Sequence, residues 1–197
     1  MLDFDERVVL SIRTFAERFG ISQRVSAELY NVADALPQEH WERFEGFYTN
    51  PPFGASNHGK SVKAFIRRGL EAVGYDAIGC LVLADHPSYP WTRDVLLTTQ
   101  RMLVQSGFMI SELFPEFHHY HLDDAPELTS CSMVVRRVEY QPVAYASMPL
   151  EPSMLANFYG EGSPLRVRYV RDLTKGGELT SRDHSMEPLE SGGAAHD

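Results

Sequence analysis

The stretch IGCLVLADH, residues 78–86, is a nearly continuous apolar run that ends in two polar residues. Such a run is typical of a parallel strand that is buried on both faces of a sheet. The helix-like patterns GKSVKAFIRRGLEAVG (59–74) and TRDVLLTTQRMLVQSG (92–107) precede and follow it. Because short strands alternate with amphipathic helices in this way, the sequence predicts an α/β fold with a mostly parallel sheet.

The same alternation extends toward the N-terminus. MLDF (1–4) and RVSAELYNV (24–32) are typical of strands, and DERVVLSIRTFAERFG (5–20) between them is typical of a helix. A third strand is predicted at GFYTN (46–50). We expect the helix to place its apolar residues on one face, namely Val9, Ile12, Phe15, Ala16 and Phe19.

The pattern changes after residue 107. FMISELFPEFHHYHL (108–122) and TSCSMVVRRVEY (129–140) are two strand-like runs whose six-residue linker has no room for a helix. An antiparallel hairpin at the edge of the sheet is therefore predicted. Because the periodicity is lost from Pro142 onward, we predict one domain over 1–141 and an irregular extension over 142–197, disordered from about residue 172.

The composition narrows the class of partner. The net charge is −9, whereas a protein that binds phosphate backbones normally has a basic face. No apolar run is long enough to span a membrane, and acids stand at the N-terminus where a signal peptide would carry bases. Cys80 and Cys131 lie in strand-like runs, so we predict reduced thiols in a cytoplasmic protein. We expect a cationic small substrate, with no nucleic acid or membrane as partner.

Polar residues follow each predicted strand at its carboxyl end, where ligands bind in open α/β sheets. Asp3 and Asp5 follow the first strand, Asn31 and Asp34 the second, and Asp85 and His86 the run that opened this section. A carboxylate such as Asp3 can accept hydrogen bonds from both hydroxyls of a ribose. Capping of the following helix by Asp3 and Asp5 explains the same pattern equally well.

The turn Asn50-Pro51-Pro52-Phe53 is more specific. An amine that is to be alkylated must present its lone pair in line with the electrophile. The side-chain oxygen of Asn50 and the carbonyl of Pro51 can accept hydrogen bonds from that nitrogen, and the two prolines make the turn rigid. The ring of Phe53 can stack on a base or bind a cation. Between a strand and a helix, this turn indicates a group-transferring enzyme that uses an S-adenosyl compound.

Two further patterns favour ordinary explanations. FHHYHLDD (117–124) clusters His119, His121 and Asp123, but histidines on a solvated edge strand are commoner than metal ligands, so we expect no metal. The basic residues of KAFIRR (63–68) are expected on the solvated face of their helix.

Several motifs, taken in order, resemble the C-terminal catalytic domain of the N(4)-bis(aminopropyl)spermidine synthase family, the branched-chain polyamine synthases. The resemblance runs from about Leu2 to Arg137. It implies a Rossmann-like fold similar to that of S-adenosylmethionine methyltransferases. It also implies a transferase that moves aminopropyl groups from decarboxylated S-adenosylmethionine to the secondary amine of spermidine and releases methylthioadenosine. The motifs are LDFDERVV, YNVADALP, FYTNPPF, SVKAFIRRGLEAV, TTQRMLVQSGFMISELF and SMVVRR.

For the donor, the resemblance implies that Asp3 contacts the ribose and that Asp5 lies close to the donor or the amine. Asn31 occupies a position near the adenine where the family usually has an acid.

For the acceptor, Asn50 and Pro51 would orient the amine, at a position where many relatives have Asp in place of Asn50. Pro52 and Phe53 would line the substrate site, and His86 would face it.

Relatives also carry a glycine and a run of aspartates on the strand before LDFDER, from which the catalytic acid is expected. The chain begins after that strand, so we expect the first central strand to be missing and the 197-residue chain, as a fragment or wrongly started gene product, to be a poor catalyst. One alternative is an S-adenosylmethionine-dependent N-methyltransferase that acts on an amine or an adenine amino group. Another alternative is an inactive domain that binds polyamine or a partner protein. A homo-oligomer is compatible with each of these readings.

Overall fold

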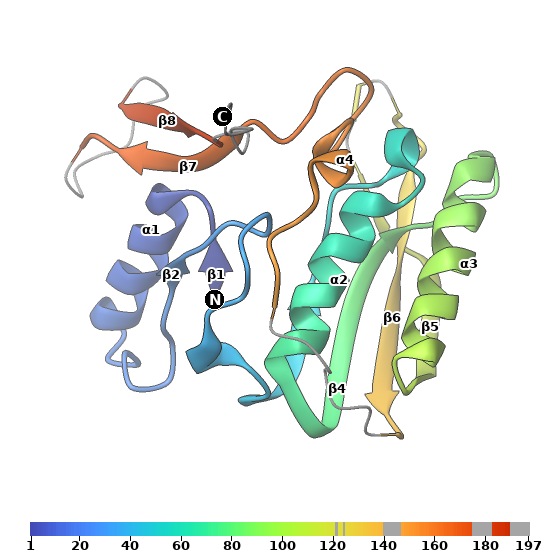
Figure 1. Ribbon diagram of the computed structural model, residues 1–197, viewed down its shortest axis with the longest axis horizontal. Helices are drawn as coiled ribbons and strands as arrows, with labels where there is room; N and C mark the ends of the chain where they lie inside the picture. The colour runs from blue at the N-terminus through green and yellow to red at the C-terminus, as the bar shows by residue number, and fades with distance from the viewer. Residues whose placement is uncertain (121, 124, 140–146, 175–182, 190–197) are drawn as a thin grey trace, which may run out of the picture. The chain divides into compact units, whose positions relative to one another are not determined.

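The computed structural model describes residues 1–120, 122–123, 125–139, 147–174 and 183–189, and they form two compact units (Figure 1). Unit 1 combines Met1–Asp34 with Leu165–Asp197, and unit 2 is the continuous segment Ala35–Pro164. This division differs from the predicted boundary near residue 141. It arises because the C-terminal part of the chain pairs with the N-terminal part.

Unit 2 contains a four-stranded sheet with the order β3-β4-β6-β5. Its strands are β3 (Phe44–Thr49), β4 (Val73–Ala84), β5 (Phe108–His119) and β6 (Thr129–Arg137). β3 is parallel to β4, whereas β6 is antiparallel to both β4 and β5. The predicted α/β class and hairpin are confirmed, but the sheet is mixed rather than mostly parallel. The short β5–β6 connection makes β6 antiparallel to β5. Because β6 lies between β5 and β4, it also pairs antiparallel with β4.

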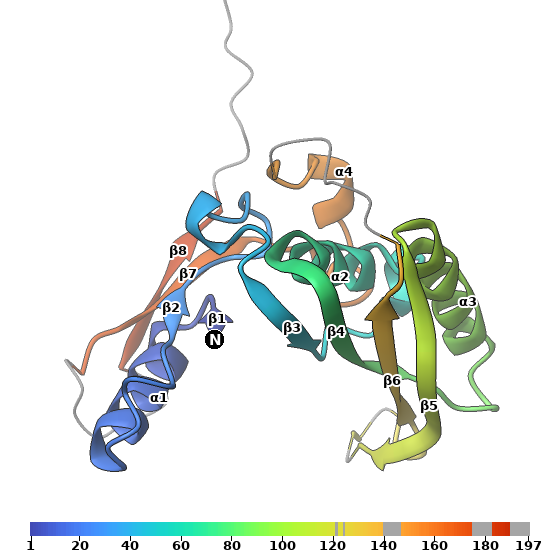
Figure 2. The same ribbon diagram turned by 90° about the horizontal axis from the view of Figure 1, so that it is seen from below.

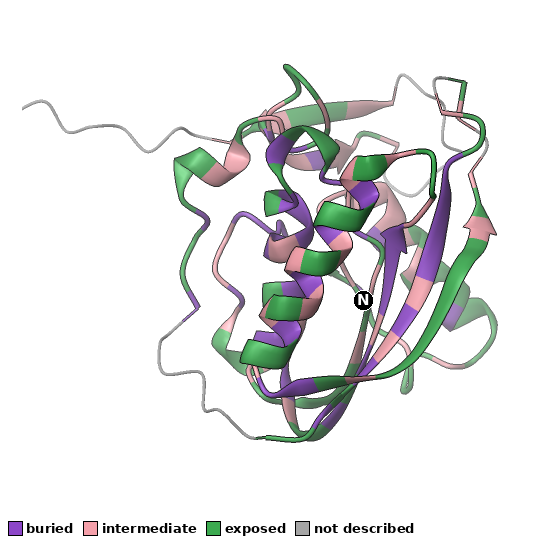
Figure 3. Cartoon of the chain, turned by 90° about the vertical axis from the view of Figure 1, so that its right-hand side faces the viewer, coloured by how far each residue is buried: buried purple, intermediate pink, exposed green. Residues whose placement is uncertain are grey.

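Helices α2 (Lys60–Ala72) and α3 (Pro90–Gln105) cover one face of this sheet (Figure 2). Buried residues recur along α2, β4 and β6. Figure 3 shows helix and strand ribbons that change between buried and exposed along their length. The unit also has short helical turns at η1 (Gln38–His40), η2 (Ala55–Asn57) and α4 (Pro152–Leu155). The core consists of Val62, Ile66, Leu70, Val73, Ala77, Leu81, Leu83, Val95, Leu103, Phe108, Cys131, Met133 and Val135.

The ring of Phe47, on β3, packs closely against Gly69 of α2 and Gly79 of the neighbouring strand β4. A Cβ atom at Gly69 would lie 2.4 Å from this ring, and one at Gly79 would lie 2.5 Å from it. Only glycine leaves room for the ring at these two positions. This packing holds β3 against α2 two residues before the strand ends, and the turn that begins at Asn50 follows directly.

Both cysteines are free. Cys131 is buried in the core, and burial raises the pKa of its thiol to about 11. Cys80 is partly buried.

Unit 1 consists of β1 (Leu2–Asp3), α1 (Glu6–Arg18), β2 (Glu28–Leu29), β7 (Val167–Asp172) and β8 (His184–Pro188). β1 and β2 are parallel, and β7 and β8 are antiparallel. The prediction of disorder from about residue 172 is wrong for β8. This strand is paired along β7 by backbone hydrogen bonds and by an ion pair of 3.0 Å between Arg171 and Glu187. Residues 175–182 and 190–197 lie outside the described residues.

Helix α1 buries only part of its predicted apolar face. Val9 and Ala16 are buried, whereas Phe15 and Phe19 are 50% and 61% exposed. The two exposed rings lie against each other with 4.6 Å between their centroids. Within unit 1, the two-residue strands β1 and β2 are too short to cover the whole stripe. No helix among the described residues is long and apolar enough to cross a membrane.

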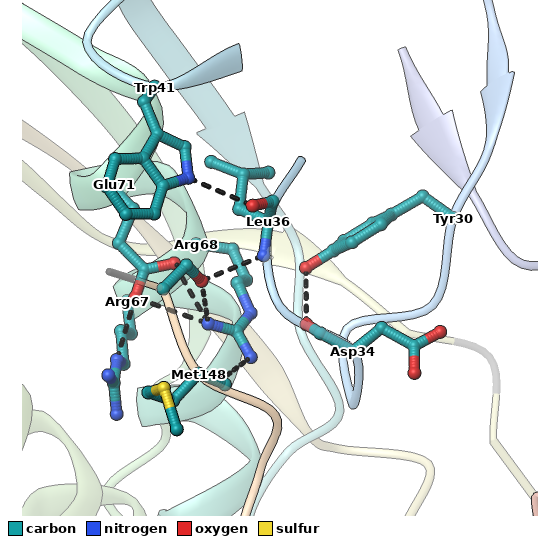
Figure 4. A network of polar contacts seen from close by, with 9 residues as sticks. Tyr30, Asp34, Leu36, Trp41, Arg67, Arg68, Glu71 and Met148 are labelled. Carbon is teal, nitrogen blue, oxygen red and sulfur yellow. Dashed lines mark hydrogen bonds and ion pairs between the residues drawn. The ribbon is translucent and has the colours of Figure 1, made fainter. Parts of the chain in front are cut away.

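Arg68 contradicts the prediction that the basic residues of α2 lie on its solvated face. It is 5% exposed, and its Nη1 donates to Glu71 Oε2 at 2.9 Å and to Ser147 Oγ at 2.8 Å (Figure 4). Its Nη2 donates to the carbonyl of Met148 at 2.8 Å. We call Arg68, Glu71 and Ser147 the Arg68 clasp. The clasp connects the C-terminal part of α2 to the chain that follows residue 146.

Candidate functional site

The two acids that follow β1 are used differently. Asp5 is the N-cap of α1, where its Oδ1 accepts from the backbone N–H of Arg7 at 2.9 Å. Its Oδ2 also pairs with the guanidinium of Arg7 at 2.6 Å. Asp3 Oδ1 accepts from the N–H of Asp5 at 2.9 Å. No partner of Asp3 Oδ2 is found among the described residues, so of the two acids Asp3 keeps the freer carboxylate.

The Asp5–Arg7 pair lies on the wall of an open hollow of about 310 Å³ in unit 1. The side-chain hydrogen bond from Arg7 is the largest effect that lowers the pKa of Asp5 below its usual range. The carboxylate is therefore charged at neutral pH, but its charge is balanced by its partner. Val8, Ser11 and Ile12 complete the lining of the hollow.

Asp5 both caps α1 and pairs with Arg7, and substitutions can separate these two roles. We expect Asp5→Ala to lower the free energy of unfolding by about 1 kcal/mol through loss of the cap, and Asp5→Asn to lower it less, because Asn caps equally well. The stabilisation that comes from the charge of Asp5 is complete above the usual carboxylate pKa. It is lost as the pH falls through the lowered pKa, so acid should affect Asp5→Asn less than the parent chain.

Chemical denaturation at pH 7 and pH 3 measures both effects. A parallel titration with methylthioadenosine then separates the two roles. If Asp5 is only a helix cap, Asp5→Asn binds the nucleoside as tightly as the parent chain. If Asp5→Asn loses nucleoside binding while its stability is unchanged, Asp5 contacts the ligand.

Asn31 has a clear structural role. It is 2% exposed, and its Nδ2 donates to the carbonyls of Val167 and Arg168 at 3.1 and 2.6 Å. Its Oδ1 accepts from the N–H of Ala33 at 2.9 Å. The side chain thus fastens the loop after β2 to β7. Both hydrogens of Nδ2 are used, so an adenine could contact the amide without breaking a hydrogen bond only through the second lone pair of Oδ1. The role of Asn31 in donor binding stays a prediction.

Asp34, beside it in sequence, pairs with residues that sequence reasoning missed. Its carboxylate accepts from Arg168 at 3.2 Å and from the hydroxyl of Tyr169 at 3.3 Å. The charge of Asp34 is the largest effect that raises the pKa of Arg168. The alternation of apolar and basic residues in LRVRY (165–169) was the sequence pattern that could have predicted this strand.

The Asn50–Phe53 turn follows β3 in unit 2. Asn50 is exposed to solvent, whereas Pro51, the next residue of the turn, is buried. Gly54 then takes a left-handed conformation with φ of 78°. A Cβ atom there would lie 2.9 Å from the Cα of Gly59, so the chain can reverse into α2 only with glycine at this position.

An aromatic pair and an imidazole lie beyond the ends of the strands. The ring of Phe53 meets that of Tyr120, which follows β5, edge to face at 5.1 Å between centroids. His86 follows β4, and its Nδ1 accepts from the N–H of Ser88 at 3.2 Å, with the ring of Tyr89 at 5.5 Å. This bond assigns the neutral imidazole its proton on Nε2, so that the free edge of the ring is a donor.

Since β3 and β4 are parallel, Asn50 and His86 follow the same edge of the unit 2 sheet. Of the predicted site residues, unit 2 therefore contains Asn50, Pro51, Pro52, Phe53 and His86, and unit 1 contains Asp3, Asp5 and Asn31. Tyr120 was missed because its neighbour in space, Phe53, is 67 positions away in sequence. Among the described residues no cluster of His, Cys, Asp and Glu could hold a metal ion, and His121 lies outside them.

Solved structures define the class of fold. The chain superimposes with a TM-score of 0.62 on a branched-chain polyamine synthase mutein from Thermus thermophilus, crystallised with N4-aminopropylspermidine and 5'-methylthioadenosine. The match has 22% identity and covers 81% of this chain and 48% of the other. A putative sarcosine dimethylglycine methyltransferase from Galdieria sulphuraria gives a TM-score of 0.51 at 9% identity, over 71% and 69% of the two chains. The fold is thus Rossmann-like, of the S-adenosylmethionine methyltransferase type.

The sequence match is more specific. The family described as "Branched-chain polyamine synthase A C-terminal domain" matches residues 1–177, and the chain belongs to this family. The N(4)-bis(aminopropyl)spermidine synthase of Thermus thermophilus is 28% identical over 120 residues, which are 61% of this chain and 33% of that protein. The chain therefore spans about a third of the curated relative and about half of the solved one.

Proposed function

We propose that this chain is a transferase domain that moves an aminopropyl group from decarboxylated S-adenosylmethionine to the secondary amine of spermidine or a related polyamine. The family match over residues 1–177 carries the proposal, because it includes the Asn50–Phe53 turn at the carboxyl end of β3. A relative of similar fold was crystallised with an aminopropylated spermidine and methylthioadenosine, a product pair that this reaction would leave.

In the proposed reaction the amine attacks the methylene carbon bonded to the sulfonium. The nitrogen lone pair forms the new C–N bond, and the electrons of the C–S bond leave with the sulfur of methylthioadenosine. Asn50 Oδ1 and the Pro51 carbonyl accept the two hydrogen bonds of the bound secondary ammonium. When one of these protons has been removed, the remaining hydrogen bond aligns the lone pair that is set free. The proton that the nitrogen loses passes to a base that the resemblance does not assign to any residue of this chain.

The acceptor is a polycation, which fits the chemistry of unit 2 near this turn. The faces of the Phe53 and Tyr120 rings can attract an ammonium group. The net charge of −9 also favours the approach of a polyamine over that of an anion.

Transfer of a methyl group from S-adenosylmethionine is the second candidate, and one observation favours it. The guanidinium of Arg7 lies on the wall of the unit 1 hollow and could bind a donor carboxylate, a group that the decarboxylated donor lacks. Arg7 is already paired with Asp5, so this carboxylate would have to compete with Asp5. We rank aminopropyl transfer first for that reason.

Calorimetric titration distinguishes these functions without requiring turnover. The chain is titrated with methylthioadenosine and, separately, with S-adenosylmethionine, and spermidine is then added to the methylthioadenosine complex. Tighter binding of methylthioadenosine, with spermidine binding on top of it, supports aminopropyl transfer. Tighter binding of S-adenosylmethionine supports methyl transfer. Spermidine binding without either nucleoside supports an inactive polyamine-binding domain.

A further inference from the structure

Residues 147–163 of unit 2 follow α2 from its C-terminal part to its N-terminal end, and we call them the strap. At the C-terminal part of α2, Arg68 donates to Ser147 Oγ within the Arg68 clasp and to the carbonyl of Met148 (Figure 4). Further along, Lys60 Nζ donates to the Ser153 carbonyl at 3.4 Å. The strap is thus attached along the helix and not only at one point.

The far end of the strap contacts the loop between Gly54 and α2. Asn157 Nδ2 donates to the Ser56 carbonyl at 3.4 Å, and Asn57 Nδ2 donates to the Asn157 carbonyl at 3.2 Å. The neighbouring Phe158 is 1% exposed, and its ring lies 6.2 Å from that of Phe65 on α2. The loop and the strap are therefore joined by two hydrogen bonds, one donated by a side-chain amide of each segment. Both bonds lie near the buried ring of Phe158.

Asn157 is itself well fixed for this role. Its Oδ1 accepts from the N–H of Gly162 at 3.0 Å, and its carbonyl accepts from the N–H of Gly160 at 3.3 Å. Its φ of 50° is left-handed, a conformation that asparagine tolerates better than most residues. The strap therefore presents the Asn157 amide to the loop from a rigid turn.

The loop between Gly54 and α2 depends on contacts with neighbouring segments to hold its backbone conformation. Gly54, His58 and Gly59 all have positive φ values, and no side chain caps α2 at Gly59. A backbone of this kind is not stabilised by a regular hydrogen-bond ladder and must be fixed by its surroundings. Asn57 is 5% exposed, and its Oδ1 accepts from Ser61 N and Oγ at 3.4 Å. It is therefore the residue through which α2 and the strap both fix the loop.

We propose that the strap positions the Asn50–Phe53 turn for the amine, with Asn157 as a positioning residue that acts through Ser56 and Asn57. The proposal rests on the proposed function, since it names what the strap serves. Asn157 does not touch the substrate. It limits the loop that continues directly from the turn, and so reduces the motion that Asn50 and Pro51 would have to lose when they bind the amine.

The test compares Asn157→Asp with Ala156→Asp. In Asn157→Asp the side chain can still accept from Gly162, but it can no longer donate to Ser56. Ala156→Asp adds the same charge one residue away, at an exposed side chain that makes no polar contact. Asn157→Gly keeps the left-handed backbone and removes the amide, so it replaces Asn157→Asp if the latter unfolds.

The first measurement is the affinity for spermidine on the methylthioadenosine complex. We expect it to be about tenfold weaker in Asn157→Asp and Asn157→Gly, with nucleoside affinity unchanged. The added carboxylate should by itself attract the polyamine, so a loss in Asn157→Asp opposes its own charge effect. Ala156→Asp should bind spermidine at least as well as the parent chain.

The second measurement is the side-chain amide resonance of Asn50 in chain labelled with ¹⁵N-asparagine. We expect this resonance to move in Asn157→Asp and to stay in place in Ala156→Asp. A resonance that stays in place in Asn157→Asp overturns the strap's action on the turn, and a resonance that moves without loss of spermidine affinity overturns the positioning role. If the parent chain binds no spermidine, the proposed function fails, whereas the resonance still reports on the strap.

Discussion

Replacing Glu71 with alanine is expected to lower the free energy of unfolding by about 3–5 kcal/mol. Glu71 is 4% exposed and accepts from the buried guanidinium of Arg68 and from the hydroxyl of Ser147. Without this carboxylate, the charge of Arg68 remains in the interior without its counter-charge, which is the costly way to break a buried ion pair. Denaturant unfolding, followed by circular dichroism at neutral pH, measures the loss.

Arg67 offers a matched control on the same helix. It also pairs with Glu71, at 2.8 Å, but its side chain is 45% exposed. Arg67→Ala should therefore cost less than about 1 kcal/mol, as exposed pairs do. The double substitution Arg68→Met with Glu71→Leu should recover most of the stability, because it removes both charges. Equal losses in Glu71→Ala and Arg67→Ala would show that the Arg68 clasp is not a buried ion pair in solution.

Replacing Asn50 with alanine is expected to weaken spermidine binding to the methylthioadenosine complex by about 10- to 100-fold. The estimate corresponds to the loss of one hydrogen bond to a charged group. Because Asn50 is exposed, the substitution should leave the thermal unfolding temperature nearly unchanged. Calorimetry on the folded variant measures the affinity directly.

Asn50→Asp is the informative companion, since it keeps an acceptor of the same shape and adds a negative charge. We expect it to bind spermidine as well as the parent chain or better. If Asn50→Ala binds spermidine with unchanged affinity, the turn does not hold the amine, and the proposed role of Asn50 and Pro51 is wrong.

The sequence predicted the elements of unit 2 because their signals are local. The apolar part of the run at 78–86, residues 78–84, lies within β4, and the two flanking helical patterns match α2 and α3. The start of β4 at Val73 was missed, because Tyr75 and Asp76 interrupt the apolar pattern while the backbone still pairs with β3 near Phe44. Pairing along a strand depends on the neighbouring strand, and no window of sequence contains that neighbour.

The remaining errors have the same cause. Arg68 reads as a surface residue because its partner Ser147 is 79 positions away, and β8 reads as disordered because β7 is needed to order it. At the site, the sequence singled out the Asn50–Phe53 turn, but not Tyr120 or Asn157, which contact the turn and the loop after it from distant parts of the chain. Long-range contacts of this kind follow from topology and not from composition.

Unit 1 is built from two segments that lie far apart in the chain, and this affects the order in which the two units can fold. Unit 2 is continuous from Ala35 to Pro164, whereas unit 1 joins the first 34 residues to the chain from Leu165 onward. During synthesis, every residue of unit 2 has been made before β7 exists, so unit 2 can fold while α1 has only β1 and β2, and not yet β7, to pack against. The buried amide of Asn31, which binds the carbonyls of Val167 and Arg168, closes a loop of more than 130 residues. Unit 1 is thus the slow-forming part of the molecule, and its nascent N-terminal segment is the part most exposed to proteases and to premature association.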